Sequence, residues 1–145
     1  MICLIQRVSH GQVTVQQKII GEINRGLVVL VGFQADDNHQ KITKMSHKLL
    51  HYRLFSDNQN KMNLNVQQVQ GELLLIPQFT LAANTKKGLR PSFSSAAPPE
   101  LATSLFNQFV TEVKKNTPSI QTGAFGADML VSLTNDGPVT FWLEV

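Results

Sequence analysis

Two short segments contain residue types and spacing that could support chemistry. Residues 77–81 (PQFTL) place an amide, an aromatic ring and a hydroxyl group side by side on Gln78, Phe79 and Thr80. Residues 135–140 (NDGPVT) combine a glycine, which permits close approach of the backbone, with a proline, which fixes φ. A structural interpretation is open for both: the end of an amphipathic strand for the first, and a hairpin turn for the second.

The common catalytic templates are absent from the sequence, which has no GxSxG elbow, no P-loop and no HExxH motif. His47 and His51 are four residues apart on an expected helix. Two imidazoles without a neighbouring carboxylate make a weak metal site, so a solvated helix face is the favoured interpretation. Cys3, the only cysteine, lies in an apolar strand, where a buried structural thiol is expected. We therefore expect no metal site.

Length and composition limit the classes of protein to consider. The chain has 145 residues, the length of one domain with its own core. Charged residues make up only 16%, and the net charge of +3 is a weak basic bias that tolerates a polyanionic partner without requiring one. The sequence has neither the order of a signal peptide nor a run of about 20 apolar residues. We expect a cytoplasmic protein that does not enter the membrane.

The apolar pattern predicts the elements that must position the two segments. Alternating and continuous apolar runs predict strands at 2–8, 12–16, 18–22, 27–33, 72–76, 128–134 and 138–145. Apolar residues at helical spacing predict helices over about 37–51 and 98–115. Turns are expected at His10 and Gly11 and at 135–137, and the strand before Pro77 is expected to continue to Leu81. The expected fold class is α/β: one layered domain over residues 1–145, with mixed, largely antiparallel sheets and two main helices.

Six segments in register give the chain a specific resemblance to a known family. They are IQRV at 5–8 with VTV at 13–15, KMNL at 61–64, QFTL at 78–81, RPSF at 90–93, FGADM at 125–129 and NDGPVT at 135–140. In this combination the sequence resembles the D-aminoacyl-tRNA deacylases, also called D-tyrosyl-tRNA deacylases. The matches run from one end of the chain to the other.

The resemblance implies an activity, a partner and an assembly. Members of the family hydrolyse the ester that joins a D-amino acid to the 3′-terminal adenosine of tRNA. They also cleave the glycyl ester, and they spare L-aminoacyl-tRNA. The implied partner is therefore the 3′ end of aminoacyl-tRNA. The implied assembly is a homodimer with a cross-subunit active site and no metal or organic cofactor.

The resemblance places the catalytic site at Gln78, Phe79 and Thr80. An aminoacyl ester is already activated, so a held water molecule and a stabilised oxyanion can suffice. Backbone N–H groups near Phe79 and Thr80 are the candidate oxyanion donors. Two roles are open for Thr80, a nucleophile or a positioning residue. We favour positioning because no matching motif supplies a base, and the 2′-hydroxyl of the tRNA would then help to orient the water.

The resemblance also names substrate-binding residues. Gly137 and Pro138 would form a cis peptide that reaches into the partner's active site, holds the amino group and leaves no room for an L side chain. Arg7 would brace that loop, although an exposed strand arginine is an equal alternative. Phe125 and Met129 would line the pocket for the terminal adenine, or belong to the core.

One departure from the family leaves rival functions open. The family usually has serine where this chain has Pro77, so that hydroxyl is absent and residue 77 must occupy a bulge or an unpaired position. Lys86, Lys87 and Arg90 either contact tRNA phosphates or form a solvated loop. The alternatives to an enzyme are a catalytically impaired protein that binds the tRNA 3′ end, and a structural or assembly protein.

Overall fold

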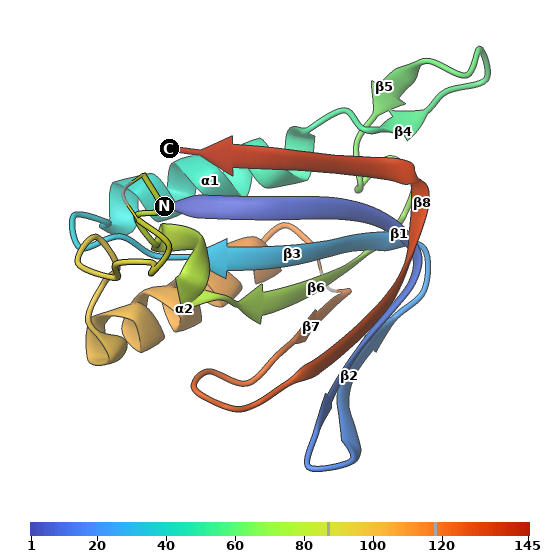
Figure 1. The fold of residues 1–145 in the computed structure, drawn as a ribbon. Helices are drawn as coiled ribbons and strands as arrows, with labels where there is room; N and C mark the ends of the chain where they lie inside the picture. The colour runs from blue at the N-terminus through green and yellow to red at the C-terminus, as the bar shows by residue number, and fades with distance from the viewer. Residues whose placement is uncertain (87, 118) are drawn as a thin grey trace.

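The strand at the centre of the fold is covered on both faces. The structure is a computed structural model that describes residues 1–86, 88–117 and 119–145 (Figure 1). Its central strand, β3 (Gly26–Gly32), is a continuous apolar run in which Leu27, Val28 and Val29 are fully buried. Such runs are typical of strands that are buried on both sides of a sheet.

The described residues form one large sheet and one small hairpin. The sheet has the order β2-β1-β3-β6-β7, and β8 pairs with β1. The pairs that include β1 are antiparallel, whereas β6 is parallel to both β3 and β7. This confirms the mixed, largely antiparallel α/β class. The bounds are β1 (Ile2–Val15), β2 (Lys18–Ile23), β6 (Glu72–Pro77), β7 (Ile120–Thr122) and β8 (Leu130–Glu144), with β4 (Phe55–Ser56) and β5 (Met62–Leu64) in the hairpin.

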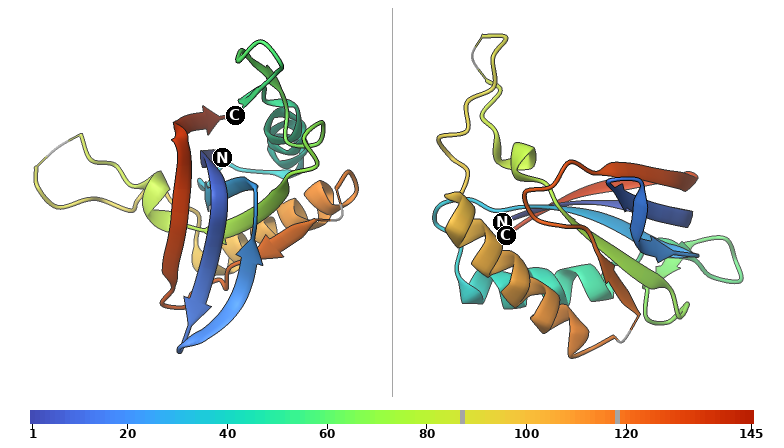
Figure 2. Two further views of the ribbon diagram at one scale, coloured as in Figure 1. Left: turned by 90° about the vertical axis from the view of Figure 1, so that its right-hand side faces the viewer. Right: turned by 90° about the horizontal axis from the view of Figure 1, so that it is seen from below.

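Two helices, α1 (His39–His51) and α2 (Pro99–Lys114), cover one face of the sheet (Figure 2). The side chain of Asn38 caps α1 by accepting hydrogen bonds from the N–H groups of Gln40 and Lys41. The apolar stripes of both helices join the strands in the main core. Both predicted helices are therefore confirmed. Among the described residues, neither is long and apolar enough to cross a membrane.

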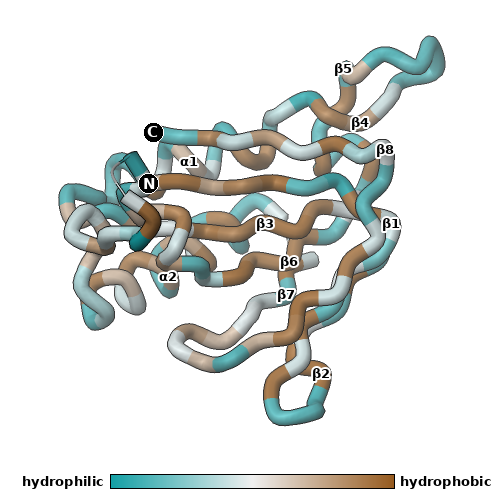
Figure 3. The backbone as a smooth tube through the Cα atoms, in the orientation of Figure 1, coloured by the Kyte–Doolittle hydropathy of each residue, from teal (hydrophilic) through white to brown (hydrophobic). Residues whose placement is uncertain are grey.

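The opposite face is covered at one end by the sheet itself. The second half of β1 curls over with β2 and the first half of β8, and encloses a second apolar cluster (Figure 3). Its buried members include Val13, Ile23 and Ile76. The other end of this face, beside the start of β1, has no such cover from the strands that the structure describes (Figure 2). The two ends of the sheet therefore differ in what lies over them.

The two predicted hairpin turns are wrong. β1 runs unbroken through His10 and Gly11, and β8 runs unbroken through residues 135–137. A Cβ at residue 11 would lie 2.6 Å from Cγ2 of Val28, so this glycine lets β1 pass close over β3. The register between β1 and β8 shifts on both sides of Val8, so the two strands bend together. Glycine and proline here mark bulges, not chain reversals.

The predicted continuation of β6 to Leu81 is also wrong. The chain turns after Pro77 into a short 3₁₀ helix, η1 (Phe79–Ala82). Gly32 makes room for it, since a Cβ there would lie 2.9 Å from Cβ of Leu81 and 3.1 Å from the carbonyl oxygen of Gln78. Cys3 is fully buried, as predicted, and burial raises the pKa of its thiol.

Candidate active site

The candidate active site begins where the parallel ladder ends. The N–H of Gln78 donates to the carbonyl of Val31 at 2.7 Å, which is the last bond between this segment and β3. The backbone nitrogen of residue 77 points the other way, toward the segment that follows β7, where the N–H of Gly123 donates to the carbonyl of Leu75 at 2.8 Å. Pro77 therefore removes no hydrogen bond to β3 and lies where hydrogen bonding on the β7 side ends. The predicted unpaired position is correct for this side of the strand, and β6 needs no bulge to accept proline.

The turn into η1 leaves two backbone donors side by side. The first N–H groups of a helix have no partner inside it. Within residues 1–86, 88–117 and 119–145, neither the Phe79 N–H nor the Thr80 N–H donates to another group. The ring of Phe79 is 56% exposed, so the site opens to solvent. Two adjacent amides of this kind can bind an oxyanion.

Within the part of the chain that the structure describes, the hydroxyl group of Thr80 forms no hydrogen bond with a side chain that could act as a base. Its oxygen accepts a hydrogen bond from the Gln78 side-chain amide, which cannot take up a proton. The sequence from residue 73 to residue 99 contains no His, Asp or Glu. This arrangement fits a positioning role better than a nucleophilic one, because an unassisted hydroxyl is a poor nucleophile at neutral pH.

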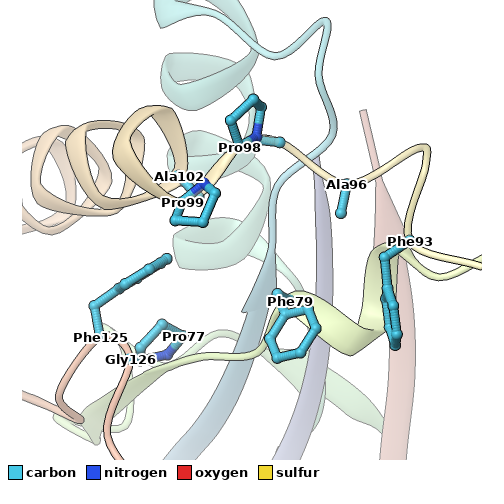
Figure 4. Close-up of a pocket in the computed structure, with 10 residues that line it drawn as sticks. Pro77, Phe79, Phe93, Ala96, Pro98, Pro99, Ala102, Phe125 and Gly126 are labelled. Atoms are coloured by element: carbon cyan, nitrogen blue, oxygen red, sulfur yellow. The ribbon is translucent and has the colours of Figure 1, made fainter.

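An aromatic cavity of about 480 Å³ is lined by Phe79, the first of the two residues with a free N–H (Figure 4). Phe79 and Phe93 form one wall with ring centroids 5.1 Å apart, and Phe125 stands on the other side. Proline rings from residues 77, 98 and 99 complete an almost wholly apolar lining. Met129 does not line this cavity. It packs against the second core cluster, so the predicted pairing of Met129 with Phe125 in one pocket has no counterpart in this cavity.

A second group of predicted residues lies at the other end of the sheet. The guanidinium of Arg7, with its side chain only 11% exposed, donates to the carbonyls of Leu54 (2.7 Å) and Asp136 (3.1 Å). Its Nε is also 3.1 Å from Oδ2 of Asp136. Arg7 thereby joins the start of the hairpin to the residue before Gly137. The exposed-arginine alternative does not fit this environment.

The backbone around Gly137 is held from both sides. The Gly137–Pro138 peptide bond is cis, and Gly137 has φ of +129°, a region that favours glycine. A Cβ on residue 137 would lie 3.1 Å from the Val139 nitrogen and 3.2 Å from Nη2 of Arg7. The side-chain oxygen of Asn135 accepts a hydrogen bond from the Val139 N–H at 3.0 Å. Asn135 and Arg7 together fix the course of this segment.

The two groups are separated within one chain. Val31, which receives the Gln78 N–H, pairs with Cys3, and Cys3 is four residues before Arg7 in β1. At about 3.3 Å per residue the groups lie roughly 13 Å apart along the sheet. Figure 1 shows the bend of β8 at the end of the sheet opposite the short helix that follows β6. Gln78, Phe79, Thr80 and Phe125 thus form one group, and Arg7, Gly137 and Pro138 another.

Sequence reasoning missed part of the cavity wall. Phe93 and Pro98 line it, and their only signal was the RPSF match and the proline pair at the start of α2. His47 and His51 are both exposed, with stacked rings 4.2 Å apart, as the solvated-face interpretation expects. The described residues contain no cluster of three or more potential metal ligands. Lys87 lies outside them.

The fold and the site define a mixed α/β protein with two exposed backbone donors beside an aromatic cavity. The family model described as D-Tyr-tRNA(Tyr) deacylase matches residues 4–144. The chain is 62% identical over 148 residues to the D-aminoacyl-tRNA deacylase of Hydrogenovibrio crunogenus, covering 99% of both chains. It is 59% identical to that of Haemophilus influenzae strain PittGG over the full length of both. The chain belongs to the D-Tyr-tRNA deacylase family, whose members are hydrolases that act on aminoacyl-tRNA.

Two solved structures are similar to the fold. One, the c-Myc DNA Unwinding Element Binding Protein, superimposes with a TM-score of 0.95 at 38% identity and covers 100% of this chain and 99% of its own. The other, a probable eukaryotic D-amino acid tRNA deacylase, has a TM-score of 0.87 at 17% identity, with 99% and 98% coverage. The second likeness supports the fold alone.

We predict that Arg7→Met lowers the free energy of unfolding by about 1–3 kcal/mol, because it leaves the buried Leu54 carbonyl without its donor. Urea unfolding followed by circular dichroism measures the change. Arg53→Met is the matched control, since Arg53 is exposed. Equal midpoints for the two variants would contradict the bracing role of Arg7.

Proposed function

We propose that this protein hydrolyses the ester bond of D-aminoacyl-tRNA and glycyl-tRNA and rejects L-aminoacyl-tRNA. The observation that carries this proposal is the pair of backbone N–H groups at Phe79, which lines the aromatic cavity, and at Thr80, whose hydroxyl group has no base as a hydrogen-bond partner among the described residues. Such a site suits an ester that is already activated and needs only oxyanion stabilisation and a placed water molecule. Membership of the family supports the same activity.

The cavity would receive the terminal adenine. Phe79 and Phe93 offer a ring surface on one side and Phe125 on the other, and stacking on an aromatic ring contributes about 1–3 kcal/mol per base. With the adenine in the cavity, the carbonyl oxygen of the ester would lie against the N–H groups of Phe79 and Thr80. Met129 would act only at a distance, through its packing in the second cluster.

The reaction would then need no covalent intermediate with the enzyme. A water molecule, oriented by the 2′-hydroxyl of the terminal ribose, adds to the carbonyl carbon while the two amides bind the oxyanion. The bond from carbon to O3′ breaks, O3′ takes the proton that the water loses, and free tRNA and amino acid leave. Gln78 holds Thr80, whose hydroxyl group helps to position the water. No step requires a metal ion or an organic cofactor.

We propose that chirality is read by Gly137 and Pro138 of a second subunit. Within one chain this segment lies roughly 13 Å from the amides, so it could act only on a partner's site. Its carbonyls would hold the amino group and leave no room for an L side chain. Large exposed apolar side chains support a homodimer: Trp142 is 51% exposed and lies opposite Leu4, on the sheet face away from the helices.

An enzyme of this kind would work where aminoacyl-tRNA is used, which we propose to be the cytoplasm, as a proofreading step in translation. The second candidate function is a protein that binds the tRNA 3′ end without turnover. Pro77 favours it, because the hydroxyl group usual in the family is absent. However, Pro77 leaves the ladder and both amides in place, so we favour the enzyme.

The purified protein should release D-tyrosine from D-tyrosyl-tRNA and leave L-tyrosyl-tRNA intact, because only the L side chain would meet the backbone wall. Labelled amino acid release measures both rates, and glycyl-tRNA should also be cleaved. Binding of tRNA with no loss of either ester would instead support the second candidate function.

Phe79→Pro should lower kcat by about 10²–10³-fold, the effect of losing one oxyanion donor. Proline suits the first position of a helix, and Gln78 has non-helical φ and ψ (−144°, 86°), so η1 should still form. Phe79→Ala is the matched control, because it loses the ring and keeps the N–H. Single-turnover rates separate the two effects from tRNA binding.

The same assay decides the role of Thr80. Thr80→Ala should retain turnover close to that of the wild type if the hydroxyl group only positions the water. A loss as large as that of Phe79→Pro would restore the nucleophile hypothesis.

Mixed dimers test the cross-subunit site. Phe79→Pro and Gly137→Ala should each be poorly active alone, since a methyl group on residue 137 would crowd Val139 and Arg7, strain the backbone at φ of +129° and shift the segment. A dimer with one subunit of each kind should regain one of its two sites, because the intact Phe79 and the intact Gly137 then meet. Two affinity tags isolate this species, and activity no higher than that of the parent variants would rule out sharing.

A further inference from the structure

We infer that the loop between η1 and α2 is an electrostatic contact for the phosphates of the tRNA acceptor end, through Lys86 and Arg90. This inference rests on the proposed function and adds a second binding region to it. The loop follows directly on the residues that carry the two exposed amides, and Figure 2 shows it standing away from the sheet and the helices.

All charged side chains between residues 73 and 99 are positive. Residues 73–99 contain no Asp or Glu, whereas Lys86, Lys87 and Arg90 are all in that stretch. Lys86 and Arg90 are exposed and form no ion pair with a described residue. Other cationic side chains form ion pairs within the chain, such as Arg7 with Asp136 and Lys41 with Asp36. Lys86 and Arg90 therefore present positive charge that no described residue neutralises through an ion pair.

The base of the loop is held in place. Asn84 and Ser92 exchange two backbone hydrogen bonds of 2.7 and 3.0 Å, and the Ser95 hydroxyl donates to the carbonyl of Ala82. The ring of Phe93 packs against that of Phe79 in the cavity wall, with the two ring planes at 54°. Lys86 is two residues beyond one member of the Asn84–Ser92 pair, and Arg90 is two residues before the other. Lys86 and Arg90 therefore lie on the two opposite sides of the loop, each two residues from the hydrogen-bonded Asn84–Ser92 pair.

The distances suit an RNA strand that ends in the cavity. Lys86 is six residues from Thr80, so it lies within about 20 Å of the reacting ester. A stacked strand advances about 3.4 Å per nucleotide, so phosphates of the last several nucleotides fall within this range. Contacts to phosphate carry no sequence information, which suits an enzyme that must accept many tRNAs. Glu144 shares a shallow cavity with Lys86, but the two form no ion pair.

The test compares Lys86→Gln/Arg90→Gln with Lys18→Gln/Lys44→Gln, which removes the same charge from exposed positions elsewhere. Two lost phosphate contacts should reduce the slope of log kcat/KM against log salt by about 1.4–1.8. Between 50 and 200 mM salt, kcat/KM of the wild type should therefore fall about 7–12-fold more than that of the loop variant. The control variant should keep the slope of the wild type.

A second substrate separates binding from chemistry. The ester D-tyrosyl-adenosine has no phosphates, so the ratio of kcat/KM for D-tyrosyl-tRNA to that for D-tyrosyl-adenosine should fall in the loop variant. An unchanged salt slope, an equal loss on both esters, or dissociation of the dimer in sedimentation would overturn the inference. If the wild-type protein hydrolyses neither ester, the proposed activity fails, and fluorescence anisotropy with uncharged tRNA still decides whether the loop variant loses affinity and salt dependence.

Discussion

The site depends on the end of the parallel ladder between β3 and β6. After Gln78 has donated to Val31, the chain must leave the sheet, and the turn into η1 leaves the N–H groups of Phe79 and Thr80 without acceptors. Gly32 permits this geometry because a Cβ there would collide with Leu81 and crowd Gln78. Exposed donors are thus created by backbone geometry, and any residue that kept the chain in a strand would remove them.

This origin of the donors explains why proline is acceptable at residue 77. The nitrogen of that residue points away from β3, so proline costs no hydrogen bond between β6 and β3. Its ring instead forms part of the cavity wall beside Phe79 and Phe125. A mechanism that depended on a side-chain hydroxyl group at residue 77 would be lost when proline replaces serine. A mechanism that depends on main-chain N–H groups can be kept. The proposed mechanism is of the second kind.

The separation of the two residue groups explains why the proposed mechanism needs a dimer. Arg7 holds the Gly137 segment rigidly at one end of the sheet, and the amides lie at the other. Within one chain the Gly137 segment lies too far from the amides of Phe79 and Thr80 to contact a substrate bound there. In the proposed dimer it would act on the site of the other subunit. The exposed apolar surface around Trp142 offers the area over which a second subunit could place the segment.

Sequence patterns predicted both helices, the buried central strand and the buried Cys3, because burial periodicity and capping are local properties. They failed at Gly11, at residues 135–137 and after Pro77, where local turn signals compete with long-range strand pairing. Glycine and proline mark bulges here because β1 and β8 bend together over the second core. Which residues meet was decided only by folding: Phe93 joins Phe125 in the cavity and Met129 does not, since contacts between distant segments depend on how the sheet curls and not on the order of residues along the chain.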